Sequence, residues 1–285
     1  MGEIYIKNKW LPYLLILPTF LLICIFKLYP IFNSVVQGVL SSDGTFTLDN
    51  YQLLFADKTF WSSLWITLKF NLIIIPCQII LSFVMALIVN VKVKGIEGFR
   101  TVFYLPFCIS LTVATVIWQM MLSVNNGVAN SILGIFGIAP VGFLIDKKWA
   151  LLSIVLIASW RGCAYWMMFF LAGLKGIDTS VYESAKIDGA GFFTSLFKIT
   201  VPLLKNTWLF VFVANTTANF LMFAPIQIAT EGGPQGSTNV LMYEAYKAAF
   251  KYSNRPRQAC IVTILLVIIM LICLIQNKTL SEKEA

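Results

Sequence analysis

Long apolar runs are the feature that most restricts what this chain can fold into. A helix rises about 1.5 Å per residue and the hydrocarbon core of a bilayer is about 30 Å thick, so about 20 apolar residues form a membrane-spanning helix. Six runs of at least roughly this length follow one another, and polar segments separate them. The runs cover residues 11–39, 64–90, 101–123, 149–174, 202–228 and 259–276. The sequence therefore predicts an all-α, polytopic membrane protein with six transmembrane helices.

The composition supports a membrane protein and disfavours several other classes. Of the 285 residues, 59% are hydrophobic and 12% are charged, whereas soluble domains have about 45–50% apolar residues. The net charge of +8 is spread thinly between the apolar runs, which favours positive cytoplasmic loops over a nucleic-acid partner. The six cysteines stand singly in apolar stretches and the chain has no histidine. We therefore expect no metal site, no disulfide framework, no catalytic residues and no enzyme activity.

The number of spans and the positive charges together predict the orientation. Six spans place both termini on the same side of the membrane. Lys and Arg are slightly more numerous on the side of the termini and of the loops at 91–100 and 175–201 than on the other side. Because cytoplasmic loops carry an excess of Lys and Arg, this side is predicted to be cytoplasmic. We expect a cytoplasmic N-terminus at 1–10, a six-span domain at 11–278 and a cytoplasmic tail at 279–285.

The loop at about 175–201, between the fourth and fifth runs, has a regular internal pattern. Ser180 and Glu183 have the spacing of a capping box, in which a hydroxyl and a carboxylate satisfy backbone amides at a helix start. Gly189 is expected to end this helix, because glycine adopts the left-handed conformation at low cost. The pattern predicts a short polar helix, a glycine break and a second helix before Pro202 opens the next span.

Small and aromatic side chains give this loop two different surfaces. Ser184, Ala185 and Ala190 are small enough to let another backbone approach closely. An apolar face at helical spacing consists of Phe192, Phe193, Leu196 and Phe197. We interpret the loop as a docking element for a partner protein. The alternative is a capped cytoplasmic hairpin that has no partner.

Polar residues inside the apolar runs are the candidates for a substrate path. Such residues are costly in a bilayer and usually face the bundle interior or a cavity, and aromatic side chains beside them offer flat surfaces for stacking. The alternative is that they form hydrogen bonds between helices and ordinary aromatic packing. The path candidates are Asn71, Gln78, Trp118, Gln119, Trp160, Arg161, Tyr165, Asn215 and Asn219, with Thr216, Thr217, Trp166 and Phe220 beside them.

Arg161 is the most unusual of these candidates. It lies about twelve residues into its run, which corresponds to a depth of roughly 18 Å by helix rise. No acidic residue lies within the runs, so no carboxylate of this chain is expected to neutralise it at that depth. One hypothesis is that Arg161 faces the path and pairs with an anionic substrate. The alternative is that it meets backbone carbonyls or an acidic residue of a partner subunit.

Residues 183–202 resemble a known loop, the E-A-A-x3-G-x9-I-x-L-P loop of permease subunits in binding-protein-dependent ABC importers. Glu183, Ala185, Gly189, Ile199 and Pro202 match it in register, while the residues at 184 and 201 differ conservatively. Similarity extends over nearly the whole chain, and the stretch at 230–250 is typical of carbohydrate permeases of the maltose and glycerol-phosphate type. The stretch at 254–257, Asn-Arg-Pro-Arg, departs from the Gly-Tyr-Ala-Ala-like sequence of these relatives.

The resemblance implies a permease subunit that moves a sugar or oligosaccharide across the cell membrane of a bacterium. The loop would dock on a separate ATPase through Glu183, Ser184, Ala185, Asp188, Gly189 and Ala190. The implied partners are a homologous second permease, two cytoplasmic ATPase subunits, an extracytoplasmic solute-binding protein, the carbohydrate and membrane lipid. No G-x-x-x-x-G-K-[ST] phosphate loop occurs in this chain, so ATP and Mg²⁺ are expected on the ATPase and no cofactor on this chain.

Three alternative functions stay open at this point. The first is a permease for an anionic solute, such as a uronate-bearing oligosaccharide or glycerol phosphate. The second is an integral-membrane transferase, which would need clustered acidic residues or histidines at a membrane face. The third is a membrane receptor or assembly scaffold, which would not need a loop of the ATPase-docking type.

Overall fold

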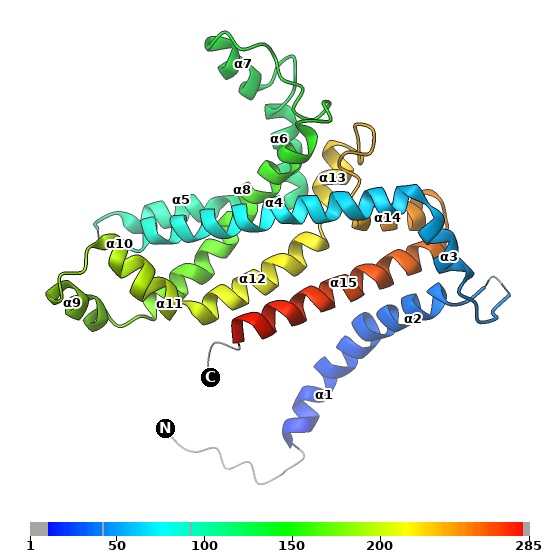
Figure 1. The fold of residues 1–285 in the computed structure, drawn as a ribbon, viewed down its shortest axis with the longest axis horizontal. Coiled ribbons are helices and arrows are strands. Elements are labelled where there is room, and N and C mark those ends of the chain that lie inside the picture. Colours follow the sequence, from blue (N-terminus) through cyan, green and yellow to red (C-terminus); the bar gives the residue numbers. More distant parts are fainter. Residues whose placement is uncertain (1–10, 42, 92, 282–285) are drawn as a thin grey trace. The chain divides into compact units, whose positions relative to one another are not determined.

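The computed structural model describes residues 11–41, 43–91 and 93–281 (Figure 1). The predicted N-terminal segment 1–10 and residues 282–285 of the predicted tail lie outside these ranges. The described residues are mainly helical, and the pairing of Leu40 with Phe46 is an isolated bridge rather than a sheet. The all-α prediction is therefore confirmed. The chain divides into two compact units, one that runs to Asp57 and includes Ala245–Ile264, and one that comprises Lys58–Glu244 and the residues from Leu265 onwards.

The first unit contains the first span and the beginning of the last helix. Its opening helices follow one another without a break and form the span Pro12–Gly38. Its elements are α1 (Leu11–Ile23), the π-helical η1 (Cys24–Leu28), α2 (Tyr29–Gly38), α3 (Asp49–Ala56), the end of α14 (Leu241–Tyr246), the π-helical η3 (Lys247–Lys251) and the first part of α15 (Arg255–Ser281).

The unusual stretch at 254–257 begins the last helix. The side chain of Asn254 accepts a hydrogen bond from the backbone amide of Arg257 at 3.0 Å, as a helix cap does. The guanidinium of Arg257 forms an ion pair with Asp57 at 2.6 Å. These residues therefore start α15 and hold it to the segment that follows α3.

The second unit contains the remaining spans and the polar loop at 175–201. Within it α4 and α8 pack against each other most extensively, and α8 has the largest buried share among the candidate spans, 61% of its apolar window. The unit comprises α4 (Lys58–Val89), α5 (Ile96–Cys108), α6 (Leu111–Met121), α7 (Val128–Ile135), α8 (Ala150–Lys175), α9 (Thr179–Ile187), α10 (Phe192–Ser195), the π-helical η2 (Leu196–Thr200), α11 (Val201–Leu203), α12 (Lys205–Phe220), α13 (Ala224–Ala229), most of α14 and the rest of α15.

The third predicted span is broken in the structure. The run at 101–123 was expected to form one helix, but α5 and α6 meet at an angle of 96°. Ile109 and Ser110 have extended backbones, and the hydroxyl of Ser110 caps α6 by accepting a hydrogen bond from the amide of Val113 at 3.2 Å. The prediction of one continuous helix is wrong because a serine cap starts a new helix inside an apolar run. Five helical spans are long and apolar enough to cross a membrane, and six if this bent pair counts as one, within the described ranges.

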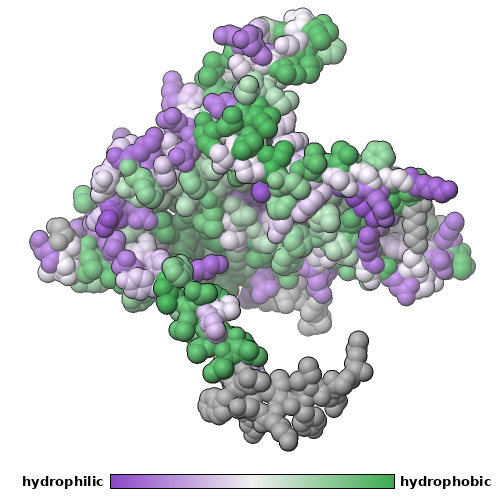
Figure 2. Space-filling view, turned by 180° about the vertical axis from the view of Figure 1, so that it is seen from behind, coloured by the Kyte–Doolittle hydropathy of each residue, from purple (hydrophilic) through white to green (hydrophobic). Residues whose placement is uncertain are grey.

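Many large apolar side chains lie on the surface of the chain. Leu72 is 77% exposed, Ile80 58% and Phe26 72%. Figure 2 shows hydrophobic residues over much of the visible face of the molecule. Such a surface is stable in contact with lipid tails or with apolar faces of other subunits, which agrees with the six predicted spans.

Candidate functional site

The loop between α8 and α12 is a helical hairpin, formed by α9 and by the α10–η2 segment, at one end of the second unit (Figure 1). Its first helix begins at Thr179, and Asp178 is the cap, because a carboxylate oxygen of Asp178 accepts a hydrogen bond from the amide of Ser180 at 3.0 Å. The predicted capping box is therefore wrong, since Ser180 lies inside the first turn and the carboxylate before it serves as the cap. The hydrogen bond from Ser180 lowers the pKa of Asp178 from its ordinary value of 3.8.

The end of α9 has the predicted glycine. Gly189 has a φ of +78°, in the left-handed region that favours glycine. Its amide donates to the carbonyl of Lys186 at 3.1 Å, and the amide of Ala190 donates to the carbonyl of Ala185 at 2.9 Å. These two bonds form a Schellman motif, which fixes the direction of the chain after the helix.

The predicted docking residues lie on two sides of α9. Glu183, Ser184, Asp188 and Gly189 are exposed, and Ala190 is half-buried. Ala185 is only 7% exposed, so its side chain is covered by other residues. An added side-chain atom at Gly189 would meet no other atom within 4 Å, so the space beside this residue is open.

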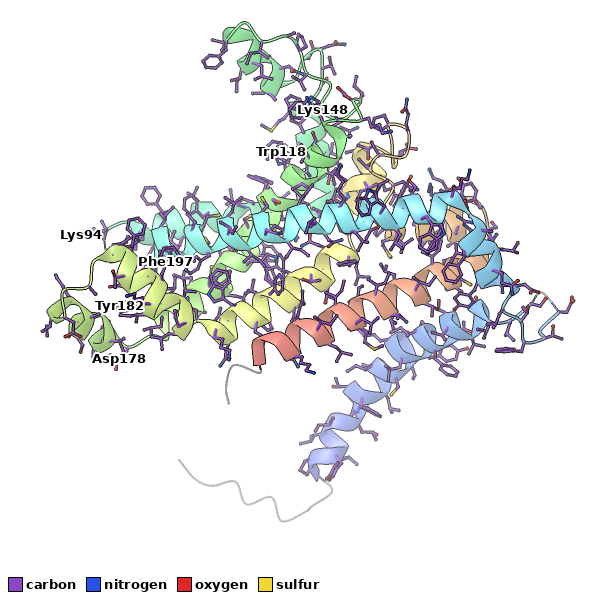
Figure 3. All side chains as sticks on the ribbon, in the orientation of Figure 1. Lys94, Trp118, Lys148, Asp178, Tyr182 and Phe197 are labelled. Atoms are coloured by element: carbon purple, nitrogen blue, oxygen red, sulfur yellow. The ribbon has the colours of Figure 1, made fainter. Side chains whose placement is uncertain are left out.

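The two arms of the hairpin are joined by a side-chain contact. The hydroxyls of Tyr182 on α9 and Thr200 on η2 lie 3.0 Å apart, within hydrogen-bond distance, and Thr200 is buried. Phe192, Phe193 and Phe197 on the second arm are 69%, 71% and 64% exposed. Figure 3 labels Asp178, Tyr182 and Phe197 on this hairpin. The hairpin is thus internally bonded and presents an apolar surface that no other described residue covers.

A buried polar network joins three helices of the second unit. The amide nitrogen of Gln78 on α4 donates to the carbonyl of Ala158 on α8 at 3.3 Å. The amide oxygen of Gln78 accepts hydrogen bonds from Asn215 at 2.7 Å and Asn219 at 3.0 Å, both on α12. Gly162 on α8 lies directly against the Gln78 amide. Gln78 and Asn215 therefore form hydrogen bonds between helices, which was the alternative to a role in the substrate path.

A cavity of about 550 Å³ lies beside this network, and Gln78, Arg161, Tyr165 and Asn219 all line it. Arg161 donates from its Nε to the carbonyl of Ile109, at the break between α5 and α6, at 2.9 Å. Its guanidinium carbon lies 4.5 Å from the centre of the Phe107 ring. The rings of Phe107 and Tyr165 stack at 4.7 Å. The cavity thus combines polar groups, one cation and aromatic rings.

The other predicted path residues lie elsewhere. Asn71 is buried and donates to the carbonyl of Thr67 on its own helix at 2.8 Å, beside a separate groove of about 380 Å³. Trp118, labelled in Figure 3, packs edge-on against Trp160 with ring centres 5.9 Å apart. Gln119 is exposed on α6. The structure therefore brings four of the nine candidates into one cavity, with Asn215 directly behind it.

With this geometry established, comparison with known proteins identifies the family. The family described as binding-protein-dependent transport system inner membrane component matches residues 78–277, which is most of the chain. The chain belongs to this family of permeases. The matched region begins at Gln78 and includes the hairpin, the cavity and nearly all of α15.

Relatives of the permease align over nearly their full length. The lactose transport system permease protein of Rhizobium radiobacter is 32% identical over 275 residues, which is 93% of this chain and 91% of that protein. The sn-glycerol-3-phosphate transport system permease protein of Shigella flexneri is 29% identical over 284 residues, 97% and 96% of the two chains. A solved bacterial ABC transporter involved in import of the acidic polysaccharide alginate has a chain with a TM-score of 0.85 at 22% identity, covering 98% of each chain, and so shares the fold.

Several residues of the permease site escaped sequence reasoning. Asp178, Tyr182 and Thr200 shape the hairpin, but Tyr182 and Thr200 are 18 residues apart and form no local pattern. Gly162 lies against the amide of Gln78, and a glycine within an apolar run gives no sign of such a contact in the sequence. Glu244, on α14, is only 2% exposed and accepts a hydrogen bond from Asn239 at 2.9 Å. Its segment lies between the apolar runs 202–228 and 259–276, and it is helical from Leu241 to Tyr246.

Proposed function

We propose that this permease imports a carbohydrate and that a separate ATPase drives it by docking on the hairpin at 183–202. The observation that carries the proposal is the hairpin itself, which is capped at both ends of α9, bonded between its arms and exposed along its outer side. A loop with no partner would have no need for three exposed phenylalanines, whereas a docking surface uses apolar residues for contact. The lactose and alginate functions named for the relatives support a carbohydrate as the solute.

The family supports the proposed assembly. A binding-protein-dependent permease works with an extracytoplasmic solute-binding protein, and a second solved structure of the same fold, at 20% identity, was determined with a periplasmic protein that carries an alginate pentasaccharide. A homologous second permease and two ATPase subunits complete the assembly, and ATP with Mg²⁺ belongs to the ATPases. The hairpin and both termini lie on the cytoplasmic side in this proposal, and the exposed apolar surfaces contact lipid and the second permease.

The proposed mechanism links the hairpin to the cavity at Arg161 through α8. Helix α8 lines the cavity at Arg161 and ends at Lys175, and α9 starts only four residues later. Closure of the ATPase pair on ATP would move the hairpin, and α8 would transmit that movement to the walls of the cavity. The permease would then alternate between inward-open and outward-open states. The coupling is the free energy by which closure of the ATPase pair favours one of these two conformations over the other.

Co-purification tests the docking surface with a matched pair of variants. Ile187 is 86% exposed on α9, and Ile135 is 80% exposed on α7, outside the hairpin. A tagged permease is purified in mild detergent from its own cells, and the proteins and solutes that accompany it are identified by mass spectrometry. We expect Ile187→Asp to lose the ATPase and to keep the second permease, while Ile135→Asp keeps both. An ATPase that stays bound to Ile187→Asp, with normal sugar uptake, would refute docking at the hairpin.

A further inference from the structure

The cavity in the second unit contains a cation that the protein only partly satisfies. Arg161 uses its Nε for the carbonyl of Ile109 and one face for the ring of Phe107. Among the residues that the structure describes, none accepts a hydrogen bond from its two terminal amino groups, and no carboxylate lies within ion-pair distance of them. Those amino groups are the two ends of a planar fork that matches a carboxylate or a phosphate.

The surroundings do not neutralise this charge. Arg161 is half-buried at about the middle of α8, and none of the residues that line the cavity is acidic. A guanidinium at this depth in a bilayer is costly unless an anion or a set of oxygen acceptors meets it. A low-dielectric wall also strengthens the field of the charge inside the cavity. The cavity is therefore better suited to an anion than to a neutral molecule.

A second group on the same wall also lacks a partner. Asn219 lines the cavity and is only 2% exposed, and its side-chain oxygen accepts no hydrogen bond from any described residue. A buried acceptor without a donor is unfavourable, and a small turn of the side chain toward the cavity would let a hydroxyl of a bound molecule donate to it. The rings of Phe107, Tyr165 and Trp166 lie close together beside it and offer flat apolar surfaces.

We infer that this cavity binds an acidic carbohydrate, whose carboxylate or phosphate pairs with Arg161 and whose hydroxyl donates to Asn219. The inference rests on the proposed import of a carbohydrate and adds the charge of the solute. The two terminal amino groups of Arg161 would bind the solute while its Nε keeps the hydrogen bond to the carbonyl of Ile109. The same residue therefore bonds the segment between α5 and α6 and binds the solute.

The experiment compares one acidic solute with its neutral counterpart in the complete importer. The solute that accompanies the purified importer is identified by mass spectrometry, which also distinguishes a uronate from a sugar phosphate. Its carboxyl-reduced or dephosphorylated form serves as the neutral counterpart. Uptake of both is measured in proteoliposomes that hold the whole complex, with each solute at a concentration that saturates the binding protein.

The measured quantity is the ratio of acidic to neutral uptake. We expect Arg161→Gln to lower that ratio by about tenfold or more, because the variant loses the charge-assisted hydrogen bonds to the anionic group. Arg161→Lys keeps the charge without the fork and should retain part of the ratio. Lys27→Gln removes the charge of a different basic residue within a span, on η1, and should leave the ratio unchanged.

A second variant tests the charge without changing Arg161, in case its replacement prevents assembly. Met222 lines the same cavity, and its side chain makes no described hydrogen bond. Met222→Glu should lower the ratio, whereas the neutral Met222→Gln should change uptake of both solutes alike. Equal losses of both solutes in Arg161→Gln, or an unchanged ratio in Met222→Glu, would overturn the inference. Import of a neutral sugar would overturn it and leave the proposed function intact, whereas an importer that carries no carbohydrate would refute both.

Discussion

The contact between Gly162 and Gln78 allows a single methyl group to test the buried network. A Cβ added at Gly162 would lie 2.8 Å from the amide carbon of Gln78 and closer still to its nitrogen. These distances are too short for any stable contact, so Gly162→Ala must displace the amide. In an ordinary helix the same change stabilises the protein by about 0.5–1 kcal/mol, because alanine loses less backbone freedom on folding than glycine.

The expected cost follows from the bonds that the Gln78 amide makes. It forms three hydrogen bonds, with Ala158, Asn215 and Asn219. Hydrogen bonds between membrane helices average about 0.6 kcal/mol, so three of them amount to about 2 kcal/mol. Subtraction of the helix preference leaves a net destabilisation of about 1 kcal/mol, which rises by a further 1–3 kcal/mol or so if the amide finds no new partner.

Thermal unfolding of the purified complex in detergent measures this cost. Gly98→Ala is the matched control, because Gly98 lies in α5 and an added Cβ there would meet no atom within 4 Å. We expect a lower midpoint for Gly162→Ala and an equal or higher one for Gly98→Ala. In a Gln78→Ala background the new methyl group has room, so its cost should disappear. Equal midpoints for the two alanine variants, or an undiminished cost in that background, would refute the reasoning.

Three further predictions concern the hairpin and the loop before α8. The Gly189→Trp variant should still insert into the membrane, but ATP hydrolysis should no longer drive uptake. Gly189→Asn should keep more of this coupling, because asparagine tolerates the φ of +78°. Normal transport by the tryptophan variant would contradict this prediction. Asn130→Ala should speed protease cleavage within 125–148, because its buried amide bonds the backbone of Val141 in both directions, at 2.8 and 3.0 Å, and the variant loses about 1–3 kcal/mol locally. The hydrogen bond from Ser180 lowers the pKa of Asp178, so the Asp178 carboxylate is charged and caps α9 at any pH above the ordinary pKa of 3.8. Protection of the α9 amides from hydrogen exchange should fall only when the pH drops through the lowered pKa. Asp178→Asn should remove that pH dependence.

The spans were predictable because hydropathy over about 20 residues depends on composition alone. Helix ends and breaks depend on single side chains, and these were less predictable. The run at 101–123 is mainly apolar along its whole length, yet the cap at Ser110 divides it into α5 and α6. Apolar runs report how much of a segment prefers lipid, but they do not report where its backbone hydrogen bonds are interrupted.

The site was predictable where a residue type has one conformational use. The left-handed Gly189 is confirmed, since few other residues adopt a positive φ at low cost. The helix start was misassigned, because Ser180 and Asp178 are both good caps and only the backbone decides between them. The depth of Arg161 follows from counting residues, but its partner Ile109 lies 52 residues away and depends on the break between α5 and α6.

Two glycines of α8 that pack closely against neighbouring helices suggest how a movement of the hairpin would be transmitted to the cavity. Near the hairpin, an added Cβ at Gly173 would lie 2.6 Å from the hydroxyl of Thr207 and 2.8 Å from the side chain of Leu204, so α8 lies directly against the start of α12. Near the cavity, Gly162 lies directly against Gln78 on α4. Between Arg161 and Lys175, α8 is an unbroken helix about 21 Å long. Because both ends of this stretch pack tightly against neighbouring helices, the proposed mechanism expects a movement of α9 to pass along α8 and to shift α4 or α12, which carry Gln78 and Asn219 in the cavity wall.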